Sequence, residues 1–146
     1  MSDNVYLGNP NLKKANTAIE FTQEQIYEFM RCKEDPVYFA NNYIKIVSLD
    51  EGLTQFHPYH FQEKLINNFH ENRFNICKMP RQTGKSTTVV SYLLHYAVFN
   101  DSVNIGILAN KAATARELLG RLQTAYENLP KWMQQGIIAW NKGSLE

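Results

Sequence analysis

MPRQTGKST, residues 79–87, is the stretch of sequence that decides the expected fold. Its last part, Gly84-Lys85-Ser86, matches the end of the Walker A pattern G-x-x-x-x-G-K-[ST], although Met79 stands where the pattern has its first Gly. A strand is predicted immediately before it, at residues 74–78, and a strongly amphipathic helix immediately after it. Because the motif works in this strand–loop–helix context, we interpret residues 79–87 as a phosphate-binding loop.

The residue types of the loop suit the phosphates of a nucleoside triphosphate. A glycine lets the backbone approach a phosphate closely, and the N-terminus of the following helix offers N–H groups to the anion. Lys85 can reach the outer phosphates, and the Ser86 hydroxyl can be a ligand of Mg²⁺. The candidate nucleotide-binding residues of the loop are Arg81, Gln82, Thr83, Gly84, Lys85, Ser86 and Thr87.

Arg81 is an unusual residue inside a plain nucleotide-binding loop. Its guanidinium can swing onto the triphosphate as an arginine finger in cis and offset charge in the transition state. Alternatively, Arg81 is an exposed side chain that only adds electrostatic attraction. The residues alone leave both interpretations open, and they make Arg81 a candidate catalytic residue together with Lys85.

Phe61-Gln62 lies about twenty residues before the loop and is a candidate base-binding pair. A Gln side chain offers a donor and an acceptor, so that Gln62 can read the two-sided edge of adenine. The aromatic neighbour can pack on the base. The alternative is a solvent-facing Gln on an amphipathic helix, and the position of the loop downstream favours the functional interpretation.

On both sides of the loop, the sequence predicts helices and strands in alternation. Capping signals predict helices that begin at Thr22 and at Asp35-Pro36. Residues 44–49 form a strand or a helix end, and a further helix begins near Pro58. After the loop come a helix with the apolar pairs Val89/Val90, Leu93/Leu94 and Ala97/Val98, a strand at 103–109, a helix from Lys111 to about Asn128 and a strand at 137–140.

This alternation predicts an α/β fold, a P-loop NTPase three-layer sandwich with a mainly parallel sheet. The sandwich is expected to be incomplete and to be preceded by an N-terminal helical region. We divide the chain into a loosely ordered arm at residues 1–20, the helical region at 21–56 and the first part of the ATPase domain at 57–146.

The bulk composition excludes several classes of protein. The chain has 146 residues, with 15 Lys and Arg against 14 Asp and Glu, and this balance argues neither for nor against nucleic acid. Cys32 and Cys77 have no C-x-x-C spacing, which disfavours a zinc site or a disulfide framework. The N-terminus lacks the apolar core of a signal peptide, and the longest apolar stretch is too short to span a bilayer. We therefore expect a soluble intracellular protein without a membrane partner.

Acidic residues that would hold a metal are not found after the loop. The predicted strand at 103–109 is followed by Asn110-Lys111, and the strand at 137–140 also ends without an acid. Asp50-Glu51 follows an apolar run as a Walker B pair does, but it precedes the loop and is followed by Gly52, so we interpret it as a turn. The four histidines show no ligand spacing.

Five segments in order carry a resemblance to a known family: DPVYFANNYIKIVSLDEGL, YHFQEKLI, MPRQTGKST, ILANKAATARELLGR and LPKWMQQGIIAWNKGSLE. Together they resemble the ATPase domain of large terminase subunits of tailed bacteriophages, most closely the myovirus type. The Arg-Gln-x-Gly-Lys-[Ser/Thr] form of Walker A is typical of terminases. Where relatives often have Tyr-Gln, this chain has Phe61-Gln62, which keeps the ring but loses its hydroxyl.

The resemblance implies an ATP-driven motor that pumps double-stranded DNA through the portal into a procapsid. It implies Arg81 as the cis arginine finger, Lys85 as the phosphate-binding lysine, Ser86 as the Mg²⁺ ligand and Gln62 as the adenine reader. It further implies a portal protein and a small terminase subunit as partners, a homo-oligomeric ring on the procapsid, and a place in the host cytoplasm and not in the mature virion.

The family also has a Walker B Asp-Glu pair, a coupling motif and a nuclease domain that cuts concatemers, all of which would lie beyond Glu146. The chain is therefore expected to be the N-terminal part of a terminase that binds ATP weakly and does not turn it over alone.

Two other classes of function remain open. A helicase-type translocase also pairs an upstream Gln with a P-loop, but its loops usually carry small residues where this chain has Arg-Gln. A non-catalytic docking module is the third class, and nucleotide-dependent thermal stabilisation would separate it from the other two.

Overall fold

The computed structural model describes residues 4–48 and 50–146. Residues 1–3, which belong to the predicted arm, and Leu49, which belongs to the predicted strand at 44–49, lie outside the described residues. The elements in order are η1 (Tyr6–Gly8), α1 (Gln23–Glu34), α2 (Pro36–Tyr43), β1 (Lys45–Ser48), β2 (Gly52–Gln55), α3 (His60–Glu71), α4 (Lys85–Phe99) and α5 (Ala112–Glu127).

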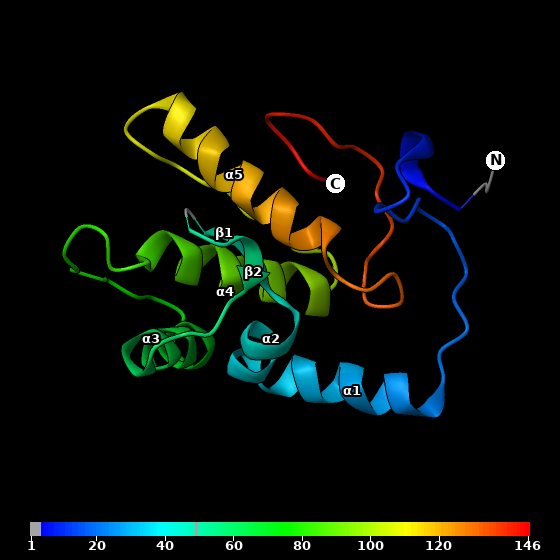
Figure 1. Ribbon diagram of the computed structural model, residues 1–146, viewed down its shortest axis with the longest axis horizontal. Coiled ribbons are helices and arrows are strands. Elements are labelled where there is room, and N and C mark those ends of the chain that lie inside the picture. The colour runs from blue at the N-terminus through cyan, green and yellow to red at the C-terminus, as the bar shows by residue number, and fades with distance from the viewer. Residues whose placement is uncertain (1–3, 49) are drawn as a thin grey trace.

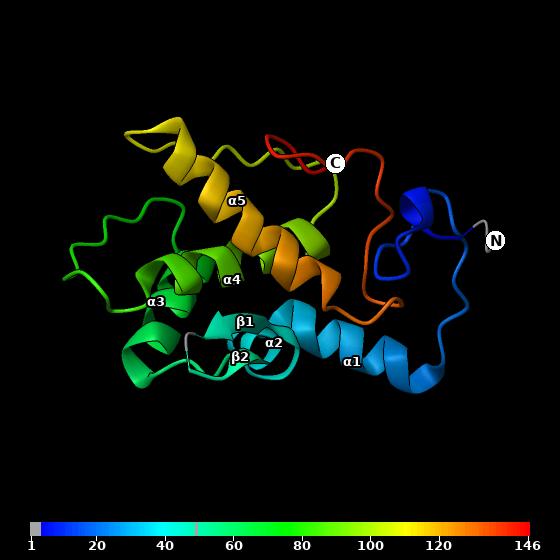
Figure 2. The same cartoon turned by 45° about the horizontal axis from the view of Figure 1, so that its top comes forward.

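Helix α4 is the centre of the molecule. It contacts α2, α3 and α5, and Figures 1 and 2 show these helices gathered around it. The predicted apolar pairs of α4 are confirmed, since Val90, Leu94 and Val98 are buried and their neighbours in each pair are half-buried. A helix that is apolar on most of its surface can only be stable with neighbours on several sides. The core is therefore built around the helix that follows the predicted phosphate loop.

The predicted helix starts are confirmed, because their caps are local in sequence. Thr22 accepts a hydrogen bond from the Gln25 N–H at 3.2 Å, and the Gln25 side chain accepts one from the Thr22 N–H at 3.0 Å. This reciprocal pair is a capping box. At α2, the Asp35 carboxylate accepts from the Tyr38 N–H at 2.8 Å, with Pro36 at the first helical position.

Within the segment predicted as a strand or a helix end, residues 45–48 form a strand with a hairpin partner. Strands β1 and β2 pair antiparallel, with Ile46 opposite Thr54. Asp50 and Glu51 form the turn, as predicted, and Gly52 follows with a φ of 70°. Two strands joined by so short a turn must run antiparallel. Among the residues that the structure describes, this hairpin is the only sheet.

The predicted fold class is wrong: the described chain is largely helical and does not form a three-layer sandwich with a mainly parallel sheet. Residues 74–78, 103–109 and 137–140 were each expected to be strands, and none of them forms one. Residues 74–78 lie in solvent, with Ile76 100% exposed, and 103–109 alternate between half-buried and exposed positions. Residues 137–140 make only isolated bridges, to Lys14 and Leu145.

The physical reason for this error is that a strand needs a neighbour. Periodicity reports which face of an extended segment is apolar, but not whether another segment lies beside it to complete the backbone hydrogen bonds. In the described residues, the backbone N–H and C=O groups of 103–109 make no backbone hydrogen bonds. Residues 103–109 do alternate between half-buried and exposed positions, but no described segment pairs with them, and residues 74–78 are exposed throughout.

The two ends of the chain are fastened to each other. Ala15 donates from its N–H to the Ile137 carbonyl at 3.1 Å, and Ile137 donates to the Lys13 carbonyl at 2.9 Å. The buried amide of Gln134 accepts from the Lys13 N–H and donates to the Asn11 carbonyl. Figure 1 shows the N-terminal segment beside the C-terminal one. Within residues 4–48 and 50–146, no helix is both long and apolar enough to cross a membrane.

Candidate functional site

Residues 79–87 form a tight turn that leads into the first turn of α4. Two residues of it have positive φ, Gln82 at 61° and Gly84 at 72°, and Gly84 is the N-cap of α4. Glycine adopts the left-handed region without strain, whereas other residues do so at a cost. The sequence therefore places its glycine where the backbone needs one.

The loop is closed by its own side chains. The carbonyl of Pro80 accepts the Lys85 ammonium at 2.9 Å and the Thr83 hydroxyl at 3.1 Å. Lys85 thus folds back across the loop that precedes it instead of extending into solvent. Its ammonium is held by one neutral acceptor, and a phosphate oxygen would be a stronger one because it is charged.

The N-terminus of α4 adds donors beside this ammonium. The first N–H groups of a helix have no intrahelical partner, and here they belong to Lys85, Ser86 and Thr87. The next N–H, of Thr88, already donates to the Gly84 carbonyl at 3.0 Å, and the Thr88 hydroxyl donates to the same oxygen. A set of free N–H groups at the positive end of a 15-residue helix favours an anion.

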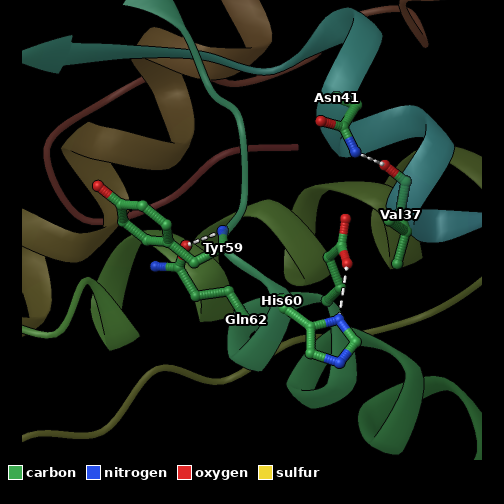
Figure 3. Close-up of polar contacts among 6 residues, drawn as sticks. Val37, Asn41, Tyr59, His60 and Gln62 are labelled. Carbon is green, nitrogen blue, oxygen red and sulfur yellow. Dashed lines mark hydrogen bonds and ion pairs between the residues drawn. The ribbon is translucent and has the colours of Figure 1, made fainter.

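Gln62 packs under the loop from α3. Its side-chain oxygen accepts the N–H of Tyr59 at 2.8 Å, a contact that Figure 3 shows as a dashed line, and its Nε2 donates to the Thr83 carbonyl at 3.3 Å. The residue is only 3% exposed. A Cβ at Gly84 would lie 2.5 Å from the Gln62 Nε2, so glycine is required there for space as well as for φ. Helix α3 and the loop are therefore in direct contact.

An exposed aromatic pair lies at the same end of α3. The rings of Tyr59 and Phe61 are stacked, with centroids 5.9 Å apart and an angle of 11° between their planes. They are 72% and 45% exposed. Flat rings that face solvent offer a surface on which another flat ring can stack.

The remaining candidate residues differ in how far they are exposed to solvent. Gln82 and Arg81 are exposed, and the Arg81 guanidinium makes no hydrogen bond or ion pair with the described residues. Ser86 and Thr87 are half-buried in the first turn of α4. The structure thus brings Gln62 into contact with Thr83 and Gly84 and brings Lys85 into contact with Pro80, whereas Arg81 makes no polar contact with the described residues.

The fit of Mg²⁺ rests on hydroxyl and phosphate oxygens. In the part of the chain that the structure describes, no three His, Cys, Asp or Glu side chains gather in a way that could hold a metal ion. Magnesium in nucleotide sites is usually bound through substrate phosphates, water and one or two protein oxygens. Ser86 lies in the first turn of α4 directly after Lys85, and its hydroxyl is an oxygen of this kind, so the donor set suits a magnesium ion that arrives with a triphosphate.

Behind the loop, α4 carries a buried histidine. The Nε2 of His95 lies 2.8 Å from the Cys32 carbonyl and donates to it, and its Nδ1 is buried without a partner. Phe39 and Phe99 pack their rings on it. Burial lowers the pKa of His95 to about 4, opposed by the hydrogen bond to Cys32. His95 is therefore a core residue that is neutral near pH 7.

Two residues of the site were not singled out from the sequence. Pro80 supplies the carbonyl that holds Lys85 and Thr83, and Thr88 fastens Gly84. The spacing of Pro80 and Thr83 was a usable signal, because a Thr hydroxyl three residues after a carbonyl can close a turn. Comparison with known protein families finds no family model that matches the chain.

Proposed function

We propose that residues 79–87 bind the triphosphate of a nucleotide, with ATP and Mg²⁺ as the ligands. The observation that carries this proposal is the closed loop: Gly84 caps α4 in the left-handed conformation while Lys85 is held across the loop at Pro80. The ammonium and the three free N–H groups of Lys85, Ser86 and Thr87 all belong to the short segment between this loop and the first turn of α4. This is the arrangement that a multiply charged anion needs.

The residues have separate roles in the proposed site. Lys85 exchanges its bond to the Pro80 carbonyl for one to the outer phosphates, and the N–H groups of Lys85, Ser86 and Thr87 cradle the inner ones. The Ser86 hydroxyl holds Mg²⁺, which would supply charge neutralisation at the phosphate oxygens. Arg81 has no contact to give up and is free to reach the phosphates as an arginine finger in cis.

We further propose that this nucleotide site serves the packaging of viral DNA. The support is the resemblance of the loop and its flanking segments to large terminase subunits, in particular the Arg81-Gln82-Thr83-Gly84-Lys85-Ser86 order. Double-stranded DNA, a portal protein, a small terminase subunit and further copies in a ring on the procapsid are the partners that this function requires. The packaging of DNA then takes place in the host cytoplasm.

Thermal unfolding with increasing Mg·ATP tests the nucleotide site. A ligand that binds only the folded chain raises the melting temperature with ln(1 + [L]/Kd). We expect such a rise for the wild type and a Kd at least about tenfold weaker for Lys85→Ala, because a charged hydrogen-bond donor to phosphate is lost.

Lys111→Ala is the matched control, since Lys111 is the exposed N-cap of α5 and begins a helix without a closed loop. It should bind Mg·ATP as the wild type does. An equal loss of Mg·ATP affinity in both variants would mean that only the overall charge of the protein matters. If Mg·ATP did not raise the melting temperature of the wild type, the proposed site would be contradicted.

A further inference from the structure

The amide of Gln62 is occupied on both sides. Its oxygen holds the Tyr59 N–H at the start of α3, and its nitrogen holds the Thr83 carbonyl in the loop. Figure 3 shows the side chain turned back beneath Tyr59. A single amide thus joins the first turn of α3 to the loop twenty-one residues later.

The surroundings of this amide leave no room for a base. The whole residue is 3% exposed, and Gly84 approaches so closely that even a methyl group on it would meet the Gln62 Nε2. Reading adenine would require the oxygen to accept from the base and the nitrogen to donate to it at once. Both atoms would have to give up the backbone partners that they hold, the Tyr59 N–H and the Thr83 carbonyl, and the free energy of these two hydrogen bonds would be lost.

From these contacts we infer that Gln62 is a positioning residue for the phosphate loop and that the base is held by stacking at Tyr59 and Phe61. This inference rests on the proposed nucleotide site and specifies its substrate class. Stacking accepts any purine ring, because every base presents a flat face. The site therefore takes ATP and GTP with similar affinity.

The wild type gives the first test, by calorimetric titration with Mg·ATP, Mg·GTP and inorganic tripolyphosphate. We expect the ATP and GTP dissociation constants to agree within about threefold, since a stacking site carries no hydrogen-bond selection. A preference for ATP above about tenfold would overturn the inference, because selection of that size is typical of a site that reads polar groups.

Gln62→Met gives the second test, because it keeps the length of the side chain, adds no charge and removes both hydrogen bonds. The affinities for ATP, GTP and tripolyphosphate should fall by one common factor of about ten, as the loop loses its support. A loss confined to ATP, with tripolyphosphate unchanged, would show instead that Gln62 reads the base.

Gln55→Met is the matched control. The Gln55 amide donates to the Ile44 carbonyl at 2.8 Å in the β1–β2 hairpin, so the variant also removes a side-chain bond to backbone but leaves the loop intact. It should bind all three ligands as the wild type does. If Gln62→Met does not fold, Gln62→Glu replaces it: the acceptor for Tyr59 remains and the donor to Thr83 is lost. Because the added negative charge would by itself repel phosphates, this variant is compared by hydrogen exchange of the free protein and not by affinity.

Hydrogen exchange of the free protein separates this inference from the proposed function. The amides of Tyr59, which donates to the Gln62 oxygen, and of Thr88, which donates to the Gly84 carbonyl at the end of the loop, should exchange about tenfold faster in Gln62→Met than in the wild type or in Gln55→Met, since a lost hydrogen bond lowers the local opening free energy. Unchanged exchange would overturn the positioning role even where nucleotides bind. Faster exchange without binding of any of the three ligands would uphold positioning but overturn the nucleotide site and its stacking surface.

Discussion

Helices α4 and α5 each follow a partly apolar segment that the sequence predicts to be a strand, yet they begin in different ways. At α4 the N-cap is Gly84 in the left-handed conformation, and the preceding loop is held by Gln62 and by Lys85. At α5 the N-cap is Lys111 in an extended conformation, without a side-chain cap. Of these two helices, only α4 is preceded by a loop that side-chain hydrogen bonds hold in place.

The difference teaches that an extended segment followed by a helix is not by itself a phosphate site. Every helix has free N–H groups at its start, and those of α5 are no exception. What distinguishes α4 is a second set of contacts that fixes the loop and folds a lysine across it. The following two predictions alter α4 and leave α5 unchanged, in order of their expected effect on nucleotide binding.

Gly84→Ala should have the largest effect. The new methyl group would meet the Gln62 Nε2 at 2.5 Å, at a φ of 72° that alanine adopts only with strain. We expect a loss of about 1–3 kcal/mol in stability and at least about a hundredfold loss of Mg·ATP affinity, because a displaced loop misplaces all its donors at once. Denaturant unfolding and calorimetry measure the two effects.

Gly106→Ala, in the segment before α5, is the control for Gly84→Ala. Its new Cβ would lie 3.7 Å from the Leu108 side chain, an ordinary contact. Stability and affinity should stay close to those of the wild type. If both alanines had the same effect, the loop before α4 would have no special geometry.

Acid should weaken the packing of α4 through His95. Burial holds its folded pKa at about 4, below the usual 6.5, so the unfolded chain takes up the proton first as the pH falls. Stability is therefore complete above pH 6.5 and declines between pH 6.5 and 4 by about 3 kcal/mol. Urea unfolding across this range measures the decline.

His95→Phe should remove this part of the pH dependence, although it also removes the hydrogen bond to Cys32 and is less stable at pH 7. His60→Asn should keep the dependence, because His60 is exposed. If both variants lost the same stability between pH 6.5 and 4, the decline would belong to titratable groups other than His95.

The helices could be predicted from the sequence because their signals are local. Thr22 and Gln25, or Asp35 and Pro36, lie within one turn of each other and specify a helix start without reference to the rest of the fold. The strands could not, since residues 74–78 and 103–109 have the right pattern but no segment beside them. Pairing is a tertiary property.

The candidate site also has a part that local sequence predicts and a part that depends on tertiary packing. Gly84, Lys85 and Ser86 follow from a motif within a few residues. The contact of Gln62 with Thr83 spans twenty-one residues and depends on how α3 packs against the loop. The position of Gln62 upstream of the loop indicated it as a residue of interest, and only the structure indicates what its amide contacts.

The most direct test of the account is an amide ¹H–¹⁵N titration of the chain with Mg·ATP. We predict saturable shifts at Lys85, Ser86 and Thr87, the free N–H groups of α4, and none at Ala112 and Ala113, the corresponding groups of α5. Equal shifts at both helix starts, or no shifts at Lys85 to Thr87, would contradict the claim that the closed loop before α4 makes a phosphate site.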